Sequence, residues 1–247
     1  EDQCSLPSRT AGCLTDATLQ WIFGRLQEAQ QRKIVVFGFL HHGVVEHFID
    51  MEFVFKEYLL DGWKAAAGQL ADAGLNLVFT GHHHATDTAR LTTDSSYIVD
   101  VQTGSTVTWS CPFRTVTYDP PAGRVAVDNV LLEEVDYDTG AQTFQQYAYD
   151  FLADGLPSLV MEVLTEDLPL PEETAAELEP LVTPTMLAYF GGDESAAQDP
   201  ALMAEIQATA DADDPVAAMV ADLCLNVWND DTPDGDLSID LTSGALE

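Results

Sequence analysis

The sequence contains very little positive charge. Only nine of its 247 residues are lysine or arginine, against 42 aspartates and glutamates, and no basic residue follows Arg124. The resulting net charge of −33 repels nucleic acids and anionic membrane surfaces, which excludes nucleic-acid binding through the protein surface. Two explanations of the acidity stay open: a salt-rich habitat that screens the self-repulsion, or the solvated acidic surface of a secreted or cell-envelope protein.

Long apolar runs and closely spaced cysteine pairs are also missing. No stretch reaches the ~18 consecutive apolar residues of a membrane-spanning helix, so the sequence predicts no transmembrane segment. The four cysteines, Cys4, Cys13, Cys111 and Cys224, form no C-x-x-C pair, which argues against a zinc knuckle or a thioredoxin-type site. Cys4 and Cys13 could close a small disulfide loop in an oxidising compartment, or they could be free thiols.

The first part of the chain alternates between helical and strand patterns. Residues 15–31 carry apolar side chains at helical spacing behind a capping residue, and they predict an amphipathic helix. Residues 33–40 and 75–80 are almost wholly apolar, as strands buried on both faces are. Residues 50–73, between them, predict a second helical segment. This order of strand, helix and strand predicts two parallel strands joined by a right-handed crossover.

The pattern then changes twice. Residues 95–109, 114–121 and 123–135 are short runs rich in Val, Thr and Tyr, and they predict antiparallel strands. With the preceding part they predict a layered α/β sandwich over residues 1–150. Residues 151–247 carry scattered apolar residues among many acidic ones, and they predict a mainly helical accessory region.

All six histidines lie in two short segments of the chain. One segment follows the first predicted strand and the other follows the second; they contain His41, His42 and His47, and His82, His83 and His84. Both segments should emerge at the same carboxyl edge of the sheet, where open α/β folds bind their ligands. Because neutral imidazole is a common ligand of zinc and iron, the sequence predicts one shared metal site. The alternative is a set of ordinary polar loop residues, or an adventitious nickel-binding run.

The spacing of His82 and His84 allows two arrangements. In an extended backbone the two rings would lie on the same side. A loop conformation, which the preceding Gly81 would permit, could instead aim them at two different metals.

Three segments in order resemble a known family. Residues 41–48 read H-H-G-x-x-E-H-F, residues 79–87 read F-T-G-H-x-H-A-x-D, and residues 103–114 read T-G-S-x-V-T-x-x-x-P-x-R. Together they resemble the last two metal-binding motifs of the calcineurin-like metallophosphoesterases and the stretch that follows them, most of all in bacterial extracytoplasmic members. The resemblance covers roughly residues 10–130. It implies a metallophosphoesterase-like sandwich, hydrolysis of phosphate mono- or diesters with two divalent metals (iron, manganese or zinc), and a secreted or cell-envelope location.

The resemblance also implies roles for individual residues. His41 and His82 would bind one metal ion and His84 the other. His42 would be a neighbour that orients or hydrogen-bonds the phosphate, not a ligand. Asp87 would accept a hydrogen bond from a ligand imidazole, or it is a plain surface carboxylate. In such sites the two ions lie ~3.5–4 Å apart and activate a bridging hydroxide.

The sequence departs from the family in its first motifs. The D-x-H, G-D-x-x-D and G-N-H motifs, which supply the bridging carboxylate, an asparagine ligand and a catalytic histidine, are absent. In the family they precede the position of Thr10. We therefore expect a fragment that carries part of the metal site and is inactive alone. The alternative is a non-catalytic metal-binding or interaction module related to the family.

Overall fold

A four-stranded mixed sheet carries the two histidine segments. The computed structural model describes residues 10–192, 194–229 and 232–247. The strand order is β1 (Gly38–Phe39), β2 (Leu77–Thr80), β4 (Tyr97–Gln102) and β3 (Asp87–Thr92). β1, β2 and β4 are parallel, which confirms the predicted parallel pair, and β3 is antiparallel to β4. The prediction of an antiparallel strand at β4 is confirmed for its pairing with β3; because β3 turns the chain back first, β4 also runs parallel to β2.

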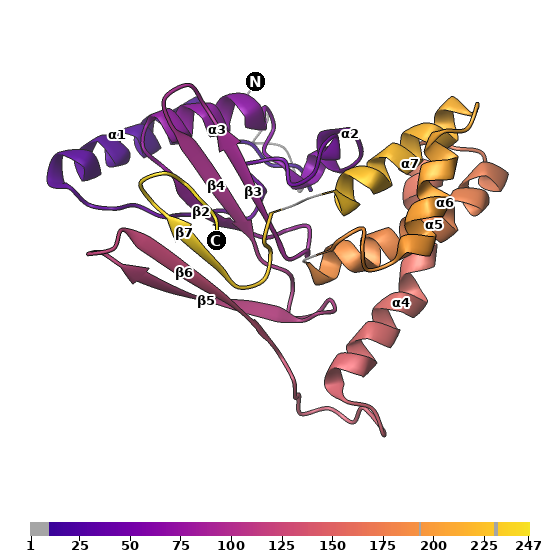
Figure 1. Ribbon diagram of the computed structural model, residues 1–247. Helices are drawn as coiled ribbons and strands as arrows, with labels where there is room; N and C mark the ends of the chain where they lie inside the picture. Colours follow the sequence, from indigo (N-terminus) through magenta and orange to yellow (C-terminus); the bar gives the residue numbers. More distant parts are fainter. Residues whose placement is uncertain (1–9, 193, 230–231) are drawn as a thin grey trace.

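A second sheet of three antiparallel strands lies against the first. It consists of β5 (Pro112–Asp119), β6 (Arg124–Leu131) and β7 (Leu237–Asp240), and the β5–β6 hairpin is as predicted. β7 comes from the end of the chain, within the range 151–247 that the sequence assigned to a mainly helical region. The chain thus returns to the sheets after its last helix, and Figure 1 shows β7 beside β6.

The elements form layers of helix, sheet and sheet (Figure 1). On one face of the first sheet, Val78 and Ile98 share a core with α1 (Asp16–Arg32) and α3 (Trp63–Asp72). On the other face, Val99 packs in a second core with residues of β6 and β7. Because successive side chains of a strand point to opposite faces, one apolar strand can serve both cores. The predicted mixed α/β class is confirmed.

Local signals fix α1, whereas contacts distant in sequence interrupt the next helix. The Thr15 hydroxyl accepts a hydrogen bond from the Thr18 amide and caps α1; the sequence had left this role open between Thr15 and Asp16. The segment predicted as one helix over 50–73 is instead α2 (Met51–Phe55), a 3₁₀ turn and α3. Between them, Leu59 and Leu60 form backbone bridges to Gly43 and Gly12, and these bridges are incompatible with a continuous helix. The first predicted strand is likewise shorter, since only β1 forms within 33–40.

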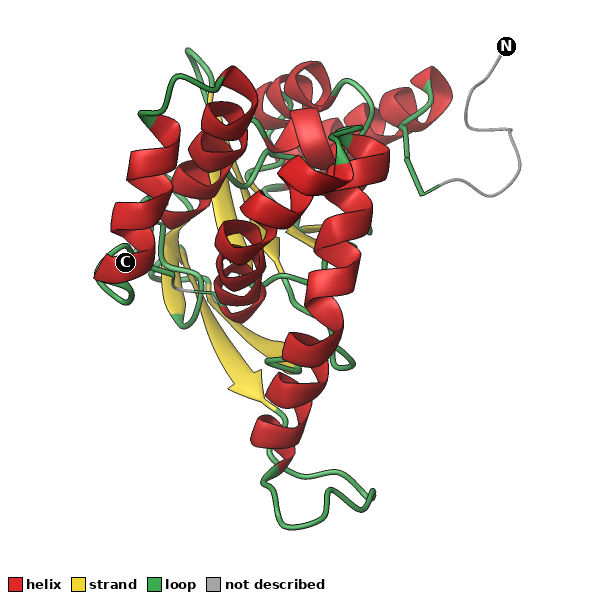
Figure 2. Cartoon of the chain, turned by 90° about the vertical axis from the view of Figure 1, so that its right-hand side faces the viewer, coloured by secondary structure: helices red, strands yellow, loops and turns green. Residues whose placement is uncertain are grey.

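The later part of the chain is helical, as predicted, but the helices begin before residue 151. Figure 2 shows the helices of the chain in red and the strands in yellow. The helices of this later part are α4 (Phe144–Glu162), the π-helical turn η3 (Val163–Asp167), α5 (Glu172–Gly191), α6 (Pro200–Ala210) and α7 (Pro215–Trp228). Leu156, Tyr189 and Val220 of these helices share the core of Val44 and Met51. The helices therefore pack on the loop side of the first sheet, next to the histidine segments.

Two further sequence expectations concern cysteines and membranes. Cys13 is disulfide-bonded, while Cys111 and Cys224 are free and buried. Cys4, which the sequence suggested as a partner of Cys13, lies outside the described residues. In the parts of the chain that the structure describes, none of the helices has the length and apolar character needed to cross a membrane.

Candidate metal centre

The histidine segments meet because β1 and β2 are parallel neighbours. His41 and His42 follow β1, and His82 follows β2. A hydrogen bond from the Gly81 amide to the His41 carbonyl continues the strand pairing beyond the sheet. The ring centroid of His82 lies 4.4 Å from that of His41 and 4.6 Å from that of His42. Three imidazoles from two strand ends are thus in contact.

The backbone of the second segment is not extended. His82 and His84 have φ angles of 71° and 62°, in the left-handed region that non-glycine residues rarely adopt. Of the two arrangements open from the sequence, the structure has the loop. The His82 ring faces His41, whereas the Nδ1 of His84 lies 3.2 Å from the Thr108 hydroxyl. Such strained residues cost about 1–3 kcal/mol each and are common at functional sites.

The environment favours the neutral form of two candidate ligands, His82 and His84. Burial, and the nearby His42 and His41, lower the pKa of His82, although a hydrogen bond to the Thr10 carbonyl opposes the shift. Partial burial and the neighbouring His41 also lower the pKa of His84. A neutral imidazole has a free lone pair, which is the form that binds a metal ion.

One backbone carbonyl oxygen lies within hydrogen-bond distance of two of the rings. The Nε2 atoms of His42 and His82 lie 2.6 Å and 3.2 Å from the carbonyl oxygen of Thr10, so each ring can donate an N–H to it. This contact could not be predicted from the sequence, because it depends on the path of the chain before α1.

The donor set fits part of a metal site and does not complete one. Neutral imidazoles suit zinc or iron, as the sequence predicts. Within residues 10–192, 194–229 and 232–247, however, no group of three or more His, Cys, Asp or Glu side chains is arranged to hold a metal ion. Among the described residues, no carboxylate joins the rings of His41, His42 and His82 to bridge two ions. Further ligands would have to come from outside the described residues.

Asp87 lies away from these rings. It is buried at the start of β3, where its Oδ1 is 3.1 Å from the Nδ1 of His47. The Nε2 of His47 faces Asp100 at 3.6 Å. Asp87 therefore contacts an imidazole, as the resemblance implied, but that of His47 and not of a proposed ligand.

Sequence reasoning missed Asp100. Its carboxylate accepts hydrogen bonds from the amides of Val44 and Val45 and from the hydroxyl of Thr80, which fixes the loop after β1 to β2 and β4. The available signal was a single acid inside an apolar strand, in the run YIVDV. Burial on its own would lower the pKa of His47, but the charges of Asp87 and Asp100 outweigh it and raise this pKa to about 10.

The middle histidine of the HHH run, His83, belongs to the core. His83 is buried and its ring lies 4.5 Å from that of Tyr58 and 4.7 Å from that of Phe55, centroid to centroid. Burial, with smaller effects from neighbouring histidines, lowers the pKa of His83 to about 3. Its neutral ring packs among aromatic side chains, which leaves the outer two histidines of the run for the site.

A cavity of about 410 Å³ opens beside the histidine loop. His82, His83 and His84 line it together with Thr10, Tyr58 and Thr108, and α4 and α5 supply an apolar wall. Among the described residues that line this cavity there is no lysine or arginine. A volume of this size is typical of small-molecule sites.

Comparisons with known proteins give this chain no relative: no protein-family model matches it, and no curated protein does. The strongest observation is the contact of His41 with His82, which two adjacent parallel strands impose.

Proposed function

We propose that this chain supplies the imidazole part of a two-metal centre that hydrolyses phosphate mono- or diesters. The observation that supports the proposal most is the 4.4 Å contact between the rings of His41 and His82 at the carboxyl edge of two parallel strands. In the proposal these two side chains bind one ion, and His84, aimed elsewhere by its left-handed backbone, binds the other.

The charge around the cavity favours metal-assisted binding of phosphate. The described lining residues include no cationic side chain, and the neutral state of His82 and His84 supplies no positive charge. The chain itself has a net charge of −33. A phosphate ester is repelled unless cations neutralise it; bound metal ions supply that charge and an activated hydroxide. In the proposal His42, whose ring contacts that of His82, hydrogen-bonds a phosphoryl oxygen.

The same proposal explains the missing ligands. The 247 residues lack the D-x-H, G-D-x-x-D and G-N-H motifs, and the described residues contain no complete ion site. We therefore expect residues 1–247 to bind a divalent ion weakly and to hydrolyse no aryl phosphate. Vigorous hydrolysis that disappears in His82→Ala would contradict the proposed division of the site.

Cobalt(II) provides the test of the metal centre, because its visible absorption reports coordination by nitrogen. We expect His41→Ala and His82→Ala each to weaken cobalt binding roughly tenfold or more. His42→Ala is the matched control, since it removes an adjacent imidazole that the proposal makes a neighbour; its cobalt affinity should stay close to that of the wild type. Equal affinity in all four proteins would refute the ligand assignment.

A second function, a non-catalytic metal-binding or interaction module, is favoured by one observation. No ion site among the described residues is complete. The coding sequence upstream of residue 1 separates the two: D-x-H and G-D-x-x-D motifs there support the phosphoesterase, and their absence from the whole gene supports the module.

A further inference from the structure

The cavity at the histidine loop, here called the histidine cavity, is one of three in a row. It shares Thr108 and Leu152 with a cavity of about 520 Å³ lined by aromatic side chains. In the other direction it shares Val163, Val182 and Met186 with a smaller cavity of about 50 Å³ between the helices, here called the inner cavity. Shared lining residues therefore connect the three cavities along α4 and η3.

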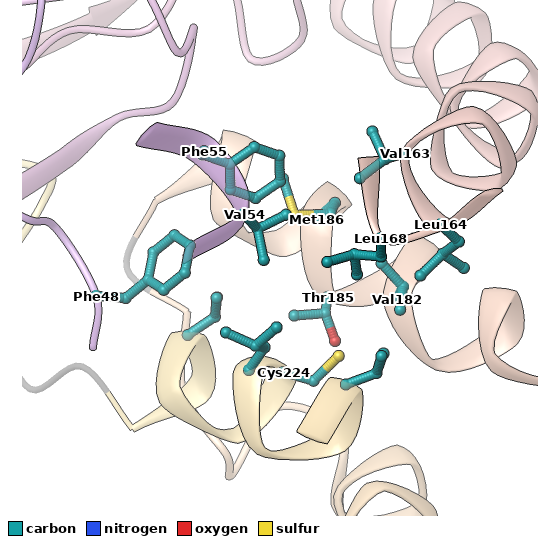
Figure 3. Close-up of a pocket in the computed structure, with 13 residues that line it drawn as sticks. Phe48, Val54, Phe55, Val163, Leu164, Leu168, Val182, Thr185, Met186 and Cys224 are labelled. Carbon is teal, nitrogen blue, oxygen red and sulfur yellow. The ribbon is translucent and has the colours of Figure 1, made fainter. Parts of the chain in front are cut away.

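The inner cavity is apolar on all sides that the structure describes. Figure 3 shows side chains of α2, η3, α5 and α7 turned towards one another around it. Its one hydroxyl, that of Thr185, already donates to the Leu181 carbonyl and accepts from the Trp228 indole. Burial raises the pKa of the Cys224 thiol to about 11, so that group is neutral too. A water molecule would find few partners here, whereas an alkyl group would be well matched.

The histidine cavity changes in polarity from one wall to the other. The polar groups, which are the histidines with Thr10, Tyr58 and Thr108, come from loops and from the 3₁₀ turn that ends at Tyr58. The helices contribute only apolar side chains, among them Leu156, Leu159 and Val160 of α4. Leu159 is 51% exposed although it is apolar, and it stands at the open side of this wall. An occupant with a charged head at the histidines and an apolar body along α4 fits this division.

We propose that the substrate of the candidate metal centre is a phosphate ester of a flexible aliphatic alcohol, whose chain runs along α4 and into the inner cavity. This inference rests on the proposed phosphoesterase function. A nucleoside or sugar phosphate fits poorly, because its hydroxyl and amide groups would lose water without finding partners on the helical wall. The small inner cavity also admits a narrow chain and excludes a ring system.

The length of the ligand's alkyl chain offers the direct test. Straight 1-alkanols from butanol to decanol are titrated into residues 1–247 by calorimetry, without metal, and the matching 1-alkyl phosphates are titrated with cobalt(II). Each methylene that enters an apolar cavity should strengthen binding by up to roughly fourfold, until the chain fills the inner cavity and the gain stops. Affinity that does not depend on chain length, or adenosine monophosphate that binds as well as octyl phosphate, would overturn the inference.

Val163→Phe tests the path of the ligand's alkyl chain between the two cavities. Val163 is partly buried and lines both the histidine cavity and the inner cavity, so a larger apolar side chain should close the passage without introducing a polar group. We expect the gain with chain length to stop at a shorter alkanol. Val116→Phe, on β5 and 41% exposed, lines none of the three cavities and is the matched control. An unchanged length limit in a folded Val163→Phe protein, checked by thermal unfolding, would contradict the path.

The alkanol titrations and the cobalt titrations together separate failure of this inference from failure of the proposed function. If cobalt binding depends on His41 and His82 but no alkanol binds, the metal proposal stands and the aliphatic substrate is refuted. If alkanols bind with the expected length dependence but His41→Ala and His82→Ala leave cobalt binding unchanged, the metal centre is refuted and with it the phosphate ester. A peptide helix that binds while alkanols do not would refute the substrate and identify a protein-docking groove.

Discussion

The Nδ1 of His47 lies 3.1 Å from the Oδ1 of Asp87, and both side chains are buried. Asp100 faces the other ring nitrogen at 3.6 Å. These three side chains come from the loop after β1, from β3 and from β4, so they hold the loop that begins with His41 and His42 against the sheet. The position of the candidate ligand His41 thus depends on the buried ionic group formed by His47, Asp87 and Asp100.

Replacing His47 should therefore destabilise the fold strongly. In His47→Gln two buried carboxylates lose their cation, and breaking a buried ion pair costs about 3–5 kcal/mol. The free energy of unfolding in urea measures this loss. Arg25→Gln is the control, because Arg25 and Glu28 form a short but exposed pair whose removal should cost less than about 1 kcal/mol. The double variant His47→Gln/Asp87→Asn should lose less free energy of unfolding than the two single variants lose in sum. Strict additivity would show that the two side chains are not coupled.

The same pair predicts how stability changes with pH. Although burial opposes it, the carboxylates of Asp87 and Asp100 raise the pKa of His47 to about 10 in the folded state, against about 6.5 in the unfolded chain. The contribution of protonated His47 to the free energy of unfolding is present in full below about pH 6.5 and is lost as the pH rises through about 10. The charged or titratable neighbours are Asp87, Asp100 and His83.

Urea unfolding between neutral and alkaline pH tests this sign. The wild type should lose stability over that interval more steeply than His47→Gln, because exposed groups contribute equally to both proteins. Parallel profiles of the two proteins would show that His47 carries no extra proton in the folded state.

Much of the candidate site was predictable, because it follows from strand order. Apolar runs before His41 and His82 predict strands, and parallel neighbours must place the residues that follow them at one edge, as the 4.4 Å contact shows. A cap at Thr15 or Asp16 could be predicted because capping depends only on residues nearby in the sequence, and the structure has it at Thr15. The roles of His41, His82 and His84 as metal ligands remain predictions.

The rest depends on pairings between residues far apart in the sequence. The β3–β4 hairpin sets Asp87 opposite Gln102, and only this register places Asp87 beneath the loop, beside His47. Leu60 leaves the helical pattern because its backbone pairs with Gly12 and Gly43. Local propensity contains no information on such partners, so the sequence predicted one helix where the structure has two.

The acidic composition predicts a stability that rises with salt. With a net charge of −33, repulsion within the folded chain is strong at low ionic strength. Raising sodium chloride from about 0.1 M to about 1 M shortens the screening length from about 10 Å to about 3 Å. We expect the midpoint of thermal unfolding to rise by several degrees, since about 1 kcal/mol corresponds to about 2–4 °C in a chain of this size. A midpoint that falls or stays constant would show that self-repulsion does not limit stability.

Two glycines should respond in opposite ways to alanine. Gly192 ends α5 with φ 79° and ψ 165°, and an added Cβ would lie 2.6 Å from the carbonyl oxygen of Thr86, just after the histidine loop. Gly192→Ala should destabilise the protein by more than about 2 kcal/mol through backbone strain and this clash. Gly155 lies inside α4 with nothing within 4 Å of its added Cβ, so Gly155→Ala should stabilise the protein by about 0.5–1 kcal/mol.

The contact of Gly192 with Thr86 also links α5 to the site, and cobalt binding reports on that link. Because Thr86 follows His84 by two positions, a shift of its backbone should displace the loop that carries His82 and His84. We therefore expect Gly192→Ala, under conditions where it is fully folded, to bind cobalt(II) more weakly than the wild type, and Gly155→Ala to bind it unchanged. Equal cobalt affinity in the two variants would show that the histidine loop keeps its position without support from the end of α5.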